Sequence, residues 1–278
     1  IRGMHNPTVK RFVIQVFRKL FLRRSFYPLH KISFRLSLHG MGILNYESTK
    51  LTGERMFLEG ILRQGHGEPP VVLDIGASDG QYSAMVKSIA PEAQVYAFEP
   101  HPLAFKRLEA SARSNGVIPF NVGCSDEEGP CVLYDYADKD YSAHASFNKG
   151  VFAKIHKKQS ISYPVGTITL DDFVERKLNI GRIRLLKTDT EGNDLKVLRG
   201  TQRLIAQKRI DVIQFEFNEM NVISRVFFKD FVDLLSDYRF YRLLPDGPVA
   251  MGEYYPVSFE LFAFQNIAAI RKDLDIRL

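Results

Sequence analysis

The chain contains no tryptophan and only two cysteines among its 278 residues. Cys124, Cys131 and seven scattered histidines supply neither a disulfide framework nor the closely spaced ligands of a zinc site. We therefore expect a protein of the reducing cytoplasm. Long hydrophobic runs are also missing, since no stretch approaches the roughly 18 apolar residues that indicate a membrane-spanning helix. The sequence predicts no transmembrane segment.

Acidic residues are absent from the first 46 positions, which hold nine Lys or Arg side chains. The first acid is Glu47, and the remaining residues hold 29 basic and 32 acidic side chains. The formal net charge of +6 therefore arises in the N-terminal segment alone. We divide the chain into a basic arm, residues 1–46, and one slightly acidic domain, residues 47–278, a length typical of a single α/β unit.

Apolar residues in the arm recur at the spacing of one helical face, with basic side chains between them. They are Val9, Phe12, Val13, Val16, Phe17, Leu20 and Phe21. One interpretation is a helix that lies on a membrane surface, with the Lys and Arg of residues 1–24 at anionic headgroups, so that the protein is peripheral to the membrane. The commoner alternative is a helix that packs on the protein's own domain.

From Val71 onward, short apolar runs alternate with amphipathic stretches, the pattern of βαβ units and a parallel sheet. We expect strands at 71–75, 94–98, 117–122, 183–187 and 212–217, with a helix after most of them. Runs at 240–244 and 259–264 predict a closing antiparallel hairpin around Asp246 and Gly247. Residues 124–170 show no clear period, so we expect an irregular active-site loop or lid there.

The first expected strand leads directly into a loop, Asp74 to Gly80, and then into a helix. Gly76 and Gly80 allow tight turns and close approach of a ligand, while the helix start offers unpaired N–H groups. The G-x-G-x-x-G pattern of a dinucleotide site is absent, which disfavours a dehydrogenase. The carboxylate of Asp74 would repel a pyrophosphate but suits a cationic amine. A plain strand-to-helix turn is the alternative interpretation.

Glu99 lies at the end of the second strand, where a carboxylate can accept hydrogen bonds from both hydroxyls of a ribose. The simpler alternative is a solvated carboxylate beside Pro100. After the third strand, Ser125 and Asp126 lie where the adenine of a bound nucleoside would rest, although the same residues can form a simple turn.

Polar residues also follow the fourth and fifth strands. They are Asp189 and Glu191 after the fourth, and Glu216 and Asn218 on the fifth. Because ligands of open parallel sheets bind beyond the carboxyl ends of the strands, we expect these acids to face one crevice with Asp74 and Glu99. Glu191 could instead be a favourable charge in the first turn of a helix, and Glu216 a satisfied carboxylate at a strand end.

With these segments in this order, the chain resembles the FkbM family of methyltransferases. The matching stretches are LDIGASDGQYS at 73–83, VYAFEPHPLAFKRLEA at 95–110, TITLDDF at 167–173, LLKTDTEGNDLKVLRG at 185–200 and IQFEFNEMN at 213–221. The resemblance implies a Rossmann-like class I methyltransferase fold with a seven-stranded, mostly parallel sheet, S-adenosylmethionine as the methyl donor, and O-methylation of a sugar, glycan or related natural product.

The resemblance also assigns residues. Asp74, Gly76 and Gly80 would lie at the methionine end of the cofactor and Glu99 at the ribose, with Ser78 a tolerated small residue in the same loop. The arm, residues 1–46, lies outside the resemblance.

The implied reaction is in-line attack of an acceptor oxygen on the donor's methyl group, helped by a base. Asp189 is our first choice of base, and His144 in the 124–170 segment is the alternative, although lone loop histidines such as His144 and His101 are more often surface residues. Glu191 completes the candidate catalytic set, and Glu216 and Asn218 are candidate substrate contacts. Asp189, Glu191 and Glu216 could also hold a divalent metal, although no spacing demands one.

Two other functions compete with this interpretation. The basic arm would suit a nucleic-acid methyltransferase, but such an enzyme needs basic residues around its crevice and the domain is net acidic. A protein that keeps the fold and binds the cofactor without catalysis is the second alternative.

Overall fold

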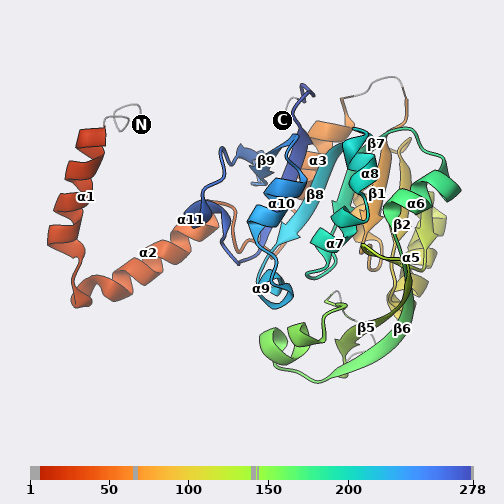
Figure 1. Ribbon diagram of the computed structural model, residues 1–278, viewed down its shortest axis with the longest axis horizontal. Helices are drawn as coiled ribbons and strands as arrows, with labels where there is room; N and C mark the ends of the chain where they lie inside the picture. The colour runs from red at the N-terminus through yellow and green to blue at the C-terminus, as the bar shows by residue number, and fades with distance from the viewer. Residues whose placement is uncertain (1–6, 65–67, 139–141, 143, 277–278) are drawn as a thin grey trace.

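The computed structural model describes residues 7–64, 68–138, 142 and 144–276, and its centre is one eight-stranded sheet (Figure 1). The strand order is β10-β9-β11-β8-β7-β1-β2-β3. The strands are β1 Val71–Ile75, β2 Gln94–Phe98, β3 Val117–Phe120, β7 Ile183–Thr188, β8 Ile210–Phe217, β9 Tyr238–Arg242, β10 Val249–Ala250 and β11 Gln265–Arg271. Strands β3, β2, β1, β7 and β8 pair in parallel, whereas β11 is antiparallel to both β8 and β9. This arrangement confirms the expected class I methyltransferase fold, with the two-residue β10 as an additional strand.

Helices cover both faces of the sheet. On one face lie α3 Glu54–Leu62, α4 Gln81–Ile89 and α5 Pro102–Asn115; on the other lie α6 Leu170–Phe173, the π-helix Val174–Leu178, α7 Asp194–Arg199, α8 Gln202–Ala206, α10 Phe228–Leu234 and α11 Pro256–Phe259. Successive residues of β1 point to opposite faces of the sheet. Val72 packs in the core beneath α3, α4 and α5, and Leu73 packs in the core on the other face. The core is therefore a three-layer sandwich of the kind that its βαβ pattern predicts.

The register of the sheet brings three loops to one edge. Ile75 of β1 pairs with Phe98 of β2 and with Thr188 of β7, and these residues end their strands. The loops that carry Gly76, Glu99 and Asp189 therefore begin side by side, as the sequence predicts for parallel strands.

Residues 124–170 are not irregular, contrary to our expectation. They contain the hairpin of β5 Gly129–Tyr136 and β6 Ser160–Ile168, and β6 also pairs with β4 Gly123–Cys124. The π-helix Val151–His156 lies between β5 and β6. Much of β6 is exposed, so its sequence lacks the buried, alternating apolar residues that reveal a strand, and backbone pairing holds it instead. This second sheet lies below the carboxyl ends of the main strands in Figure 1.

The expected strand at 259–264 is also wrong. Phe259 ends α11 and packs on Phe228, and the last strand follows it as β11. Both runs are apolar, so hydrophobicity alone could not separate them. A turn does form at Asp246 and Gly247, but it joins β9 to β10, and the closing antiparallel pair is β9 with β11.

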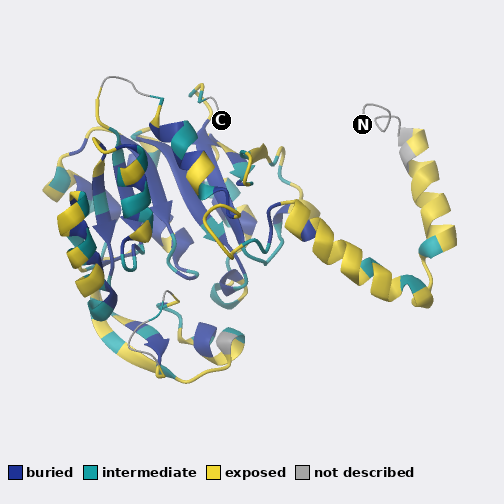
Figure 2. Cartoon of the chain, turned by 180° about the vertical axis from the view of Figure 1, so that it is seen from behind, coloured by how far each residue is buried: buried dark blue, intermediate teal, exposed yellow. Residues whose placement is uncertain are grey.

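The arm forms two helices, α1 Pro7–Phe21 and α2 Tyr27–Gly40, joined by a short 3₁₀ turn, Arg24–Phe26. The amphipathic helix expected near residues 9–21 is confirmed. It does not pack on the domain, because α2 holds it at a distance and its surface is exposed (Figure 2). No helix in the described part of the chain is long and apolar enough to cross a membrane.

Candidate active site

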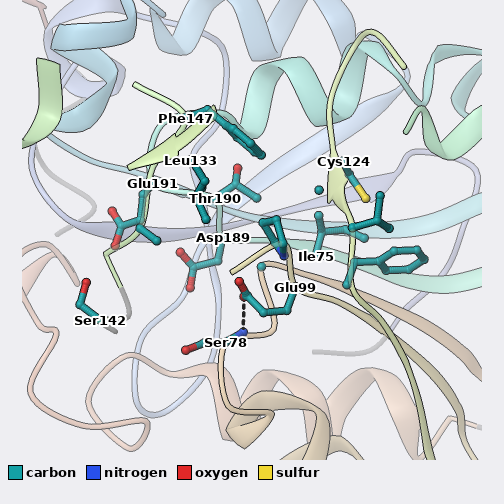
Figure 3. A pocket seen from close by; sticks show the side chains of 16 residues that line it. Ile75, Ser78, Glu99, Cys124, Leu133, Ser142, Phe147, Asp189, Thr190 and Glu191 are labelled. Atoms are coloured by element: carbon teal, nitrogen blue, oxygen red, sulfur yellow. Dashed lines mark hydrogen bonds between the residues drawn. The ribbon is translucent and has the colours of Figure 1, made fainter. Parts of the chain in front are cut away.

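A narrow pocket of about 40 Å³ opens at the carboxyl ends of β1, β2 and β7 (Figure 3). Its walls come from the loops after these strands, from the start of β4 and from the segment around β5. The lining residues are Ile75, Gly76, Ser78, Phe98, Glu99, Pro100, Val122, Gly123, Cys124, Leu133, Ser142, Ala145, Phe147, Asp189, Thr190 and Glu191. Five of the predicted site residues, Gly76, Ser78, Glu99, Asp189 and Glu191, thus meet at one pocket.

The loop after β1 needs a glycine at its first turn. Gly76 has φ +78°, and a Cβ atom there would lie 1.9 Å from the carbonyl oxygen of Asp189. Its N–H donates to Phe98 O at 2.9 Å. Gly76 therefore lets the loops after β1 and β7 touch, which sets the floor of the pocket. Gly80, with φ +89°, lies outside the pocket and begins α4.

Glu99 is buried, and its carboxylate lies at the pocket (Figure 3). Its Oε2 accepts the N–H of Ser78 at 2.8 Å and its Oε1 accepts the N–H of His101 at 2.7 Å. Burial raises the pKa of Glu99 to about 7, although these two hydrogen bonds act to lower it. Each carboxylate oxygen has two acceptor positions, so both can accept one further hydrogen bond.

Asp74 is fully buried beneath the pocket rather than lining it. Its Oδ2 accepts the hydroxyl of Ser83 at 2.7 Å, and its Oδ1 lies 3.5 Å from Nζ of Lys187. Lys187 also lies 3.2 Å from Oδ2 of Asp189. Burial disfavours the charged lysine, but the neighbouring carboxylates of Asp189 and Asp74 hold the pKa of Lys187 above its usual value.

A series of buried polar contacts, which the sequence did not reveal, extends from Lys187 into the domain. Nζ of Lys187 lies 5.1 Å from the ring centroid of Tyr82, whose hydroxyl donates to Gln214 at 2.7 Å. Gln214 in turn donates to Glu54 at 2.9 Å. Burial raises the pKa of Glu54. In the sequence, the polar residue Gln214 within the mostly apolar strand β8 was a sign of these contacts.

Glu191, which lines the pocket, forms a pair with His144. Nδ1 of His144 lies 2.7 Å from Oε1 of Glu191, and Ser146 Oγ donates to the Glu191 carbonyl at 2.8 Å. Burial raises the pKa of Glu191 to about 7, while the contact with His144 acts to lower it. The side chain of His144 is half exposed. The three predicted catalytic residues therefore lie together.

The remaining predicted residues lie outside the lining of the pocket. Asn218 Nδ2 donates to Glu216 Oε2 at 3.3 Å. Burial and the charges of Asp189 and Glu191 raise the pKa of Glu216 well above its usual value. Ser125 Oγ donates to Asp126 at 3.0 Å, directly after the pocket residue Cys124. Their roles toward adenine and acceptor stay predictions.

His101 is not the surface residue that we expected. It is fully buried, and its Nδ1 accepts the N–H groups of Leu103 and Ala104 at the start of α5. Its Nε2 lies 3.3 Å from Oδ2 of Asp135 on β5. Asp135 also accepts the N–H of Ser142 at 2.7 Å. Although burial acts to raise it, hydrogen bonds from His101 and Ser142 hold the pKa of Asp135 below its usual value.

The family model of the methyltransferase FkbM domain matches residues 74–241, which is more than half of the chain. The chain belongs to the FkbM methyltransferase family. The match includes both the acidic strand ends of the pocket and the second sheet of β4, β5 and β6.

Curated relatives of this FkbM-family chain include two methyltransferases with defined names. The hexuronic acid methyltransferase AglP of Haloferax volcanii is 27% identical over 59% of this chain and 63% of its own length. The 2-O-methyltransferase NoeI of Sinorhizobium fredii is 24% identical over 64% of this chain and 76% of its own length. The chain thus spans less than two thirds of the first of these relatives.

Among solved structures, an rRNA methylase from Streptococcus thermophilus is 13% identical, covers 78% of this chain and 93% of its own, and has a TM-score of 0.41. The precorrin-6y C5,15-methyltransferase of Geobacter metallireducens is 12% identical, covers 78% of this chain and 87% of its own, and has a TM-score of 0.38.

Proposed function

We propose that this methyltransferase of the FkbM family transfers a methyl group from S-adenosylmethionine to a hydroxyl of a sugar, a glycan or a related natural product. The observation that carries the proposal is the acidic pocket, which Glu99, Asp189 and Glu191 line together. Glu191 also contacts His144. Among the relatives of the chain, AglP is a hexuronic acid methyltransferase and NoeI is a 2-O-methyltransferase, which supports an oxygen acceptor.

The polar groups of the pocket fit the cofactor. Glu99 keeps one acceptor position on each oxygen, which suits two adjacent ribose hydroxyls. The carboxylates of Asp74, Asp189 and Glu191 outnumber the buried cation Lys187, so a ligand that carries an ammonium and a sulfonium group is electrostatically favoured. When bound, S-adenosylmethionine supplies an electrophilic methyl group.

Entry of a ligand of this size requires part of the second sheet's connections to move. The pocket encloses about 40 Å³, whereas ligand sites typically hold ~300–1,000 Å³. Phe147 narrows the pocket, because its ring lies so close to Gly123 that a Cβ atom there would be 2.7 Å from Phe147 Cζ. We therefore assign the lid role to the segment that carries Phe147, within residues 124–170.

Two side chains can accept the proton of the acceptor hydroxyl, and the structure favours His144 over Asp189. Nζ of Lys187 donates to Oδ2 of Asp189 at 3.2 Å, so this carboxylate oxygen is already engaged. The carboxylate of Glu191 contacts Nδ1 of His144 and fixes the orientation of the ring, and imidazole is the side chain that most readily exchanges a proton near neutral pH. In this assignment Asp189 binds the acceptor hydroxyl, and Glu191 orients His144.

Nucleic acid is a poor acceptor for this site. A phosphate backbone needs Lys and Arg along the crevice, whereas the pocket lining among the described residues contains three carboxylates and no Lys or Arg. No group of three or more His, Cys, Asp or Glu side chains in the described residues is placed to hold a metal ion. A divalent metal therefore has no assigned role in the proposal.

The experiment that tests the function is transfer of a labelled methyl group from S-adenosylmethionine to a panel of hexuronic acids, neutral sugars and glycans. We expect label in a saccharide product, at an ether oxygen, and none in RNA or DNA. Label in nucleic acid alone would overturn the proposal. Binding of S-adenosylhomocysteine without transfer to any member of a broad acceptor panel would indicate a binding protein of the same fold.

A further inference from the structure

The helix α1 presents an apolar face to solvent. Val9, Phe12, Val13, Val16 and Leu20 line this face, and Phe12 is 64% and Leu20 51% exposed. Large apolar side chains gain free energy when they leave water, so a face of this kind indicates a partner surface. Figure 2 shows the exposed helix standing away from the domain.

The charges of the arm have no partner within the part of the chain that the structure describes. Arg11 and Arg18, with Gln15 between them, form the face of α1 opposite the apolar residues, and Lys19 borders it. None of the described arm Lys or Arg side chains forms an ion pair with a described residue, and the arm holds no acid. The arm thus offers a continuous cationic surface beside a continuous apolar one.

The elbow between α1 and α2 is held by aromatic contacts. The ring centroids of Phe17 and Phe21 lie 5.2 Å apart, as do those of Phe21 and Phe26. Nε2 of His30 lies 3.1 Å from the carbonyl oxygen of Phe21. At the other end of α2, Leu38 is buried and Leu44 N donates to Phe264 O at 2.8 Å. The arm is therefore attached to the domain in a defined way and positions α1 beyond it.

We propose that α1 lies in the interface of an anionic lipid membrane, with its apolar face among the acyl chains and its Arg and Lys at the headgroups. Charge complementarity selects this occupant. An anionic lipid surface places dense negative charge directly beside an apolar layer. An interfacial helix needs both, one for each of its faces. A second copy of the arm would bring cations against cations. The inference is independent of the proposed acceptor.

The test uses the intact chain and vesicles of two compositions, phosphatidylcholine alone or in equimolar mixture with phosphatidylglycerol. At low ionic strength we expect the protein to sediment with the anionic vesicles only, and to be released by salt. Each basic residue near such a surface contributes ~1 kcal/mol, so Arg11→Gln, Arg18→Gln and Lys19→Gln together should weaken binding on the order of 100-fold. A second variant should no longer sediment with the anionic vesicles, because it makes the apolar face polar. It combines Phe12→Gln, Val16→Gln and Leu20→Gln.

A matched control removes three exposed charges from the domain: Lys106→Gln, Arg113→Gln and Lys177→Gln. This variant should bind anionic vesicles like the unmodified chain. Equal binding to both vesicle types, equal loss in the control and the arm variant, or no sedimentation of the intact chain would each overturn the proposal. So would an arm-dependent dimer that ignores vesicles, detected by sedimentation velocity.

Discussion

Nδ1 of His144 lies 2.7 Å from Oε1 of Glu191, a residue 47 positions further along the chain. Glu191 adopts φ +51°, and its carbonyl accepts Ser146 Oγ at 2.8 Å. Two hydrogen bonds thus join the segment between β5 and β6 to the loop after β7. The contact holds the imidazole of His144 against Glu191, which lines the same pocket as Asp189.

We expect His144→Ala to lower kcat by ~10²- to 10⁴-fold, because a general base acts in the transition state. Affinity for S-adenosylhomocysteine, measured by calorimetry, should stay unchanged. His39→Ala is the matched control, since His39 is an exposed histidine of the arm.

Asp189→Asn separates the two candidate bases. If Asp189 only binds the acceptor hydroxyl, the variant should mainly raise KM and keep the pH profile of kcat. The rise of kcat with pH reports deprotonation of the base. If Asp189→Asn lost this rise while His144→Ala kept it, the assignment to His144 would be wrong. A loss of S-adenosylhomocysteine affinity would make Asp189 a cofactor ligand.

We expect Glu99→Ala to weaken S-adenosylhomocysteine binding by ~1–3 kcal/mol, the cost of leaving buried polar groups without their partner. Ser78 N and His101 N would lose their acceptor, so the melting temperature is measured in parallel. Glu109→Ala is the control on the same side of the sheet, at a partly exposed position on α5. Unchanged affinity in a folded Glu99→Ala protein would show that Glu99 does not bind the ribose.

The stability of the ligand-free protein should depend on pH through Glu99 and Glu191. Burial raises both pKa values to about 7, whereas an unfolded glutamate titrates near ~4.3. Between these values the folded state keeps protons that the unfolded state releases. The contribution of both groups to the free energy of unfolding is therefore full below about pH 4.5 and falls as pH rises to about 7.

Urea denaturation between about pH 5 and about pH 8 measures this dependence. Glu99→Gln and Glu191→Gln should each flatten the decline, and Glu109→Gln should leave it as it is. Equal slopes in all four proteins would mean that neither carboxylate holds a proton at neutral pH.

Gly76→Ala should lower the free energy of unfolding by more than about 2 kcal/mol. A left-handed conformation costs an L-residue ~1–2 kcal/mol, and the new Cβ would also collide with the backbone of Asp189. Gly166→Ala is the control, because Gly166 has open space around it and needs no left-handed φ. A change of less than about 1 kcal/mol in Gly76→Ala, measured by chemical denaturation, would contradict the tight contact between the two loops.

The order of the elements was readable from the sequence, because most strands of the parallel core are buried and are followed by a helix. Val71–Ile75 and Gln94–Phe98 matched the expected strands residue for residue. The meeting of Gly76, Glu99 and Asp189 followed from the same pattern, since parallel strands bring their carboxyl ends to one edge. The amphipathic period of α1 was equally clear, although not its separation from the domain.

Tertiary structure alone decided the rest of the site. The hairpin of β5 and β6 is stabilised mainly by backbone pairing, which leaves little trace in the order of apolar residues. Asp74 became a buried partner of Lys187, and His101 a buried contact of Asp135, because segments distant in sequence pack against them. A sequence shows which side chains can carry charge, but their pKa values and partners depend on burial and on neighbours that only the folded chain supplies.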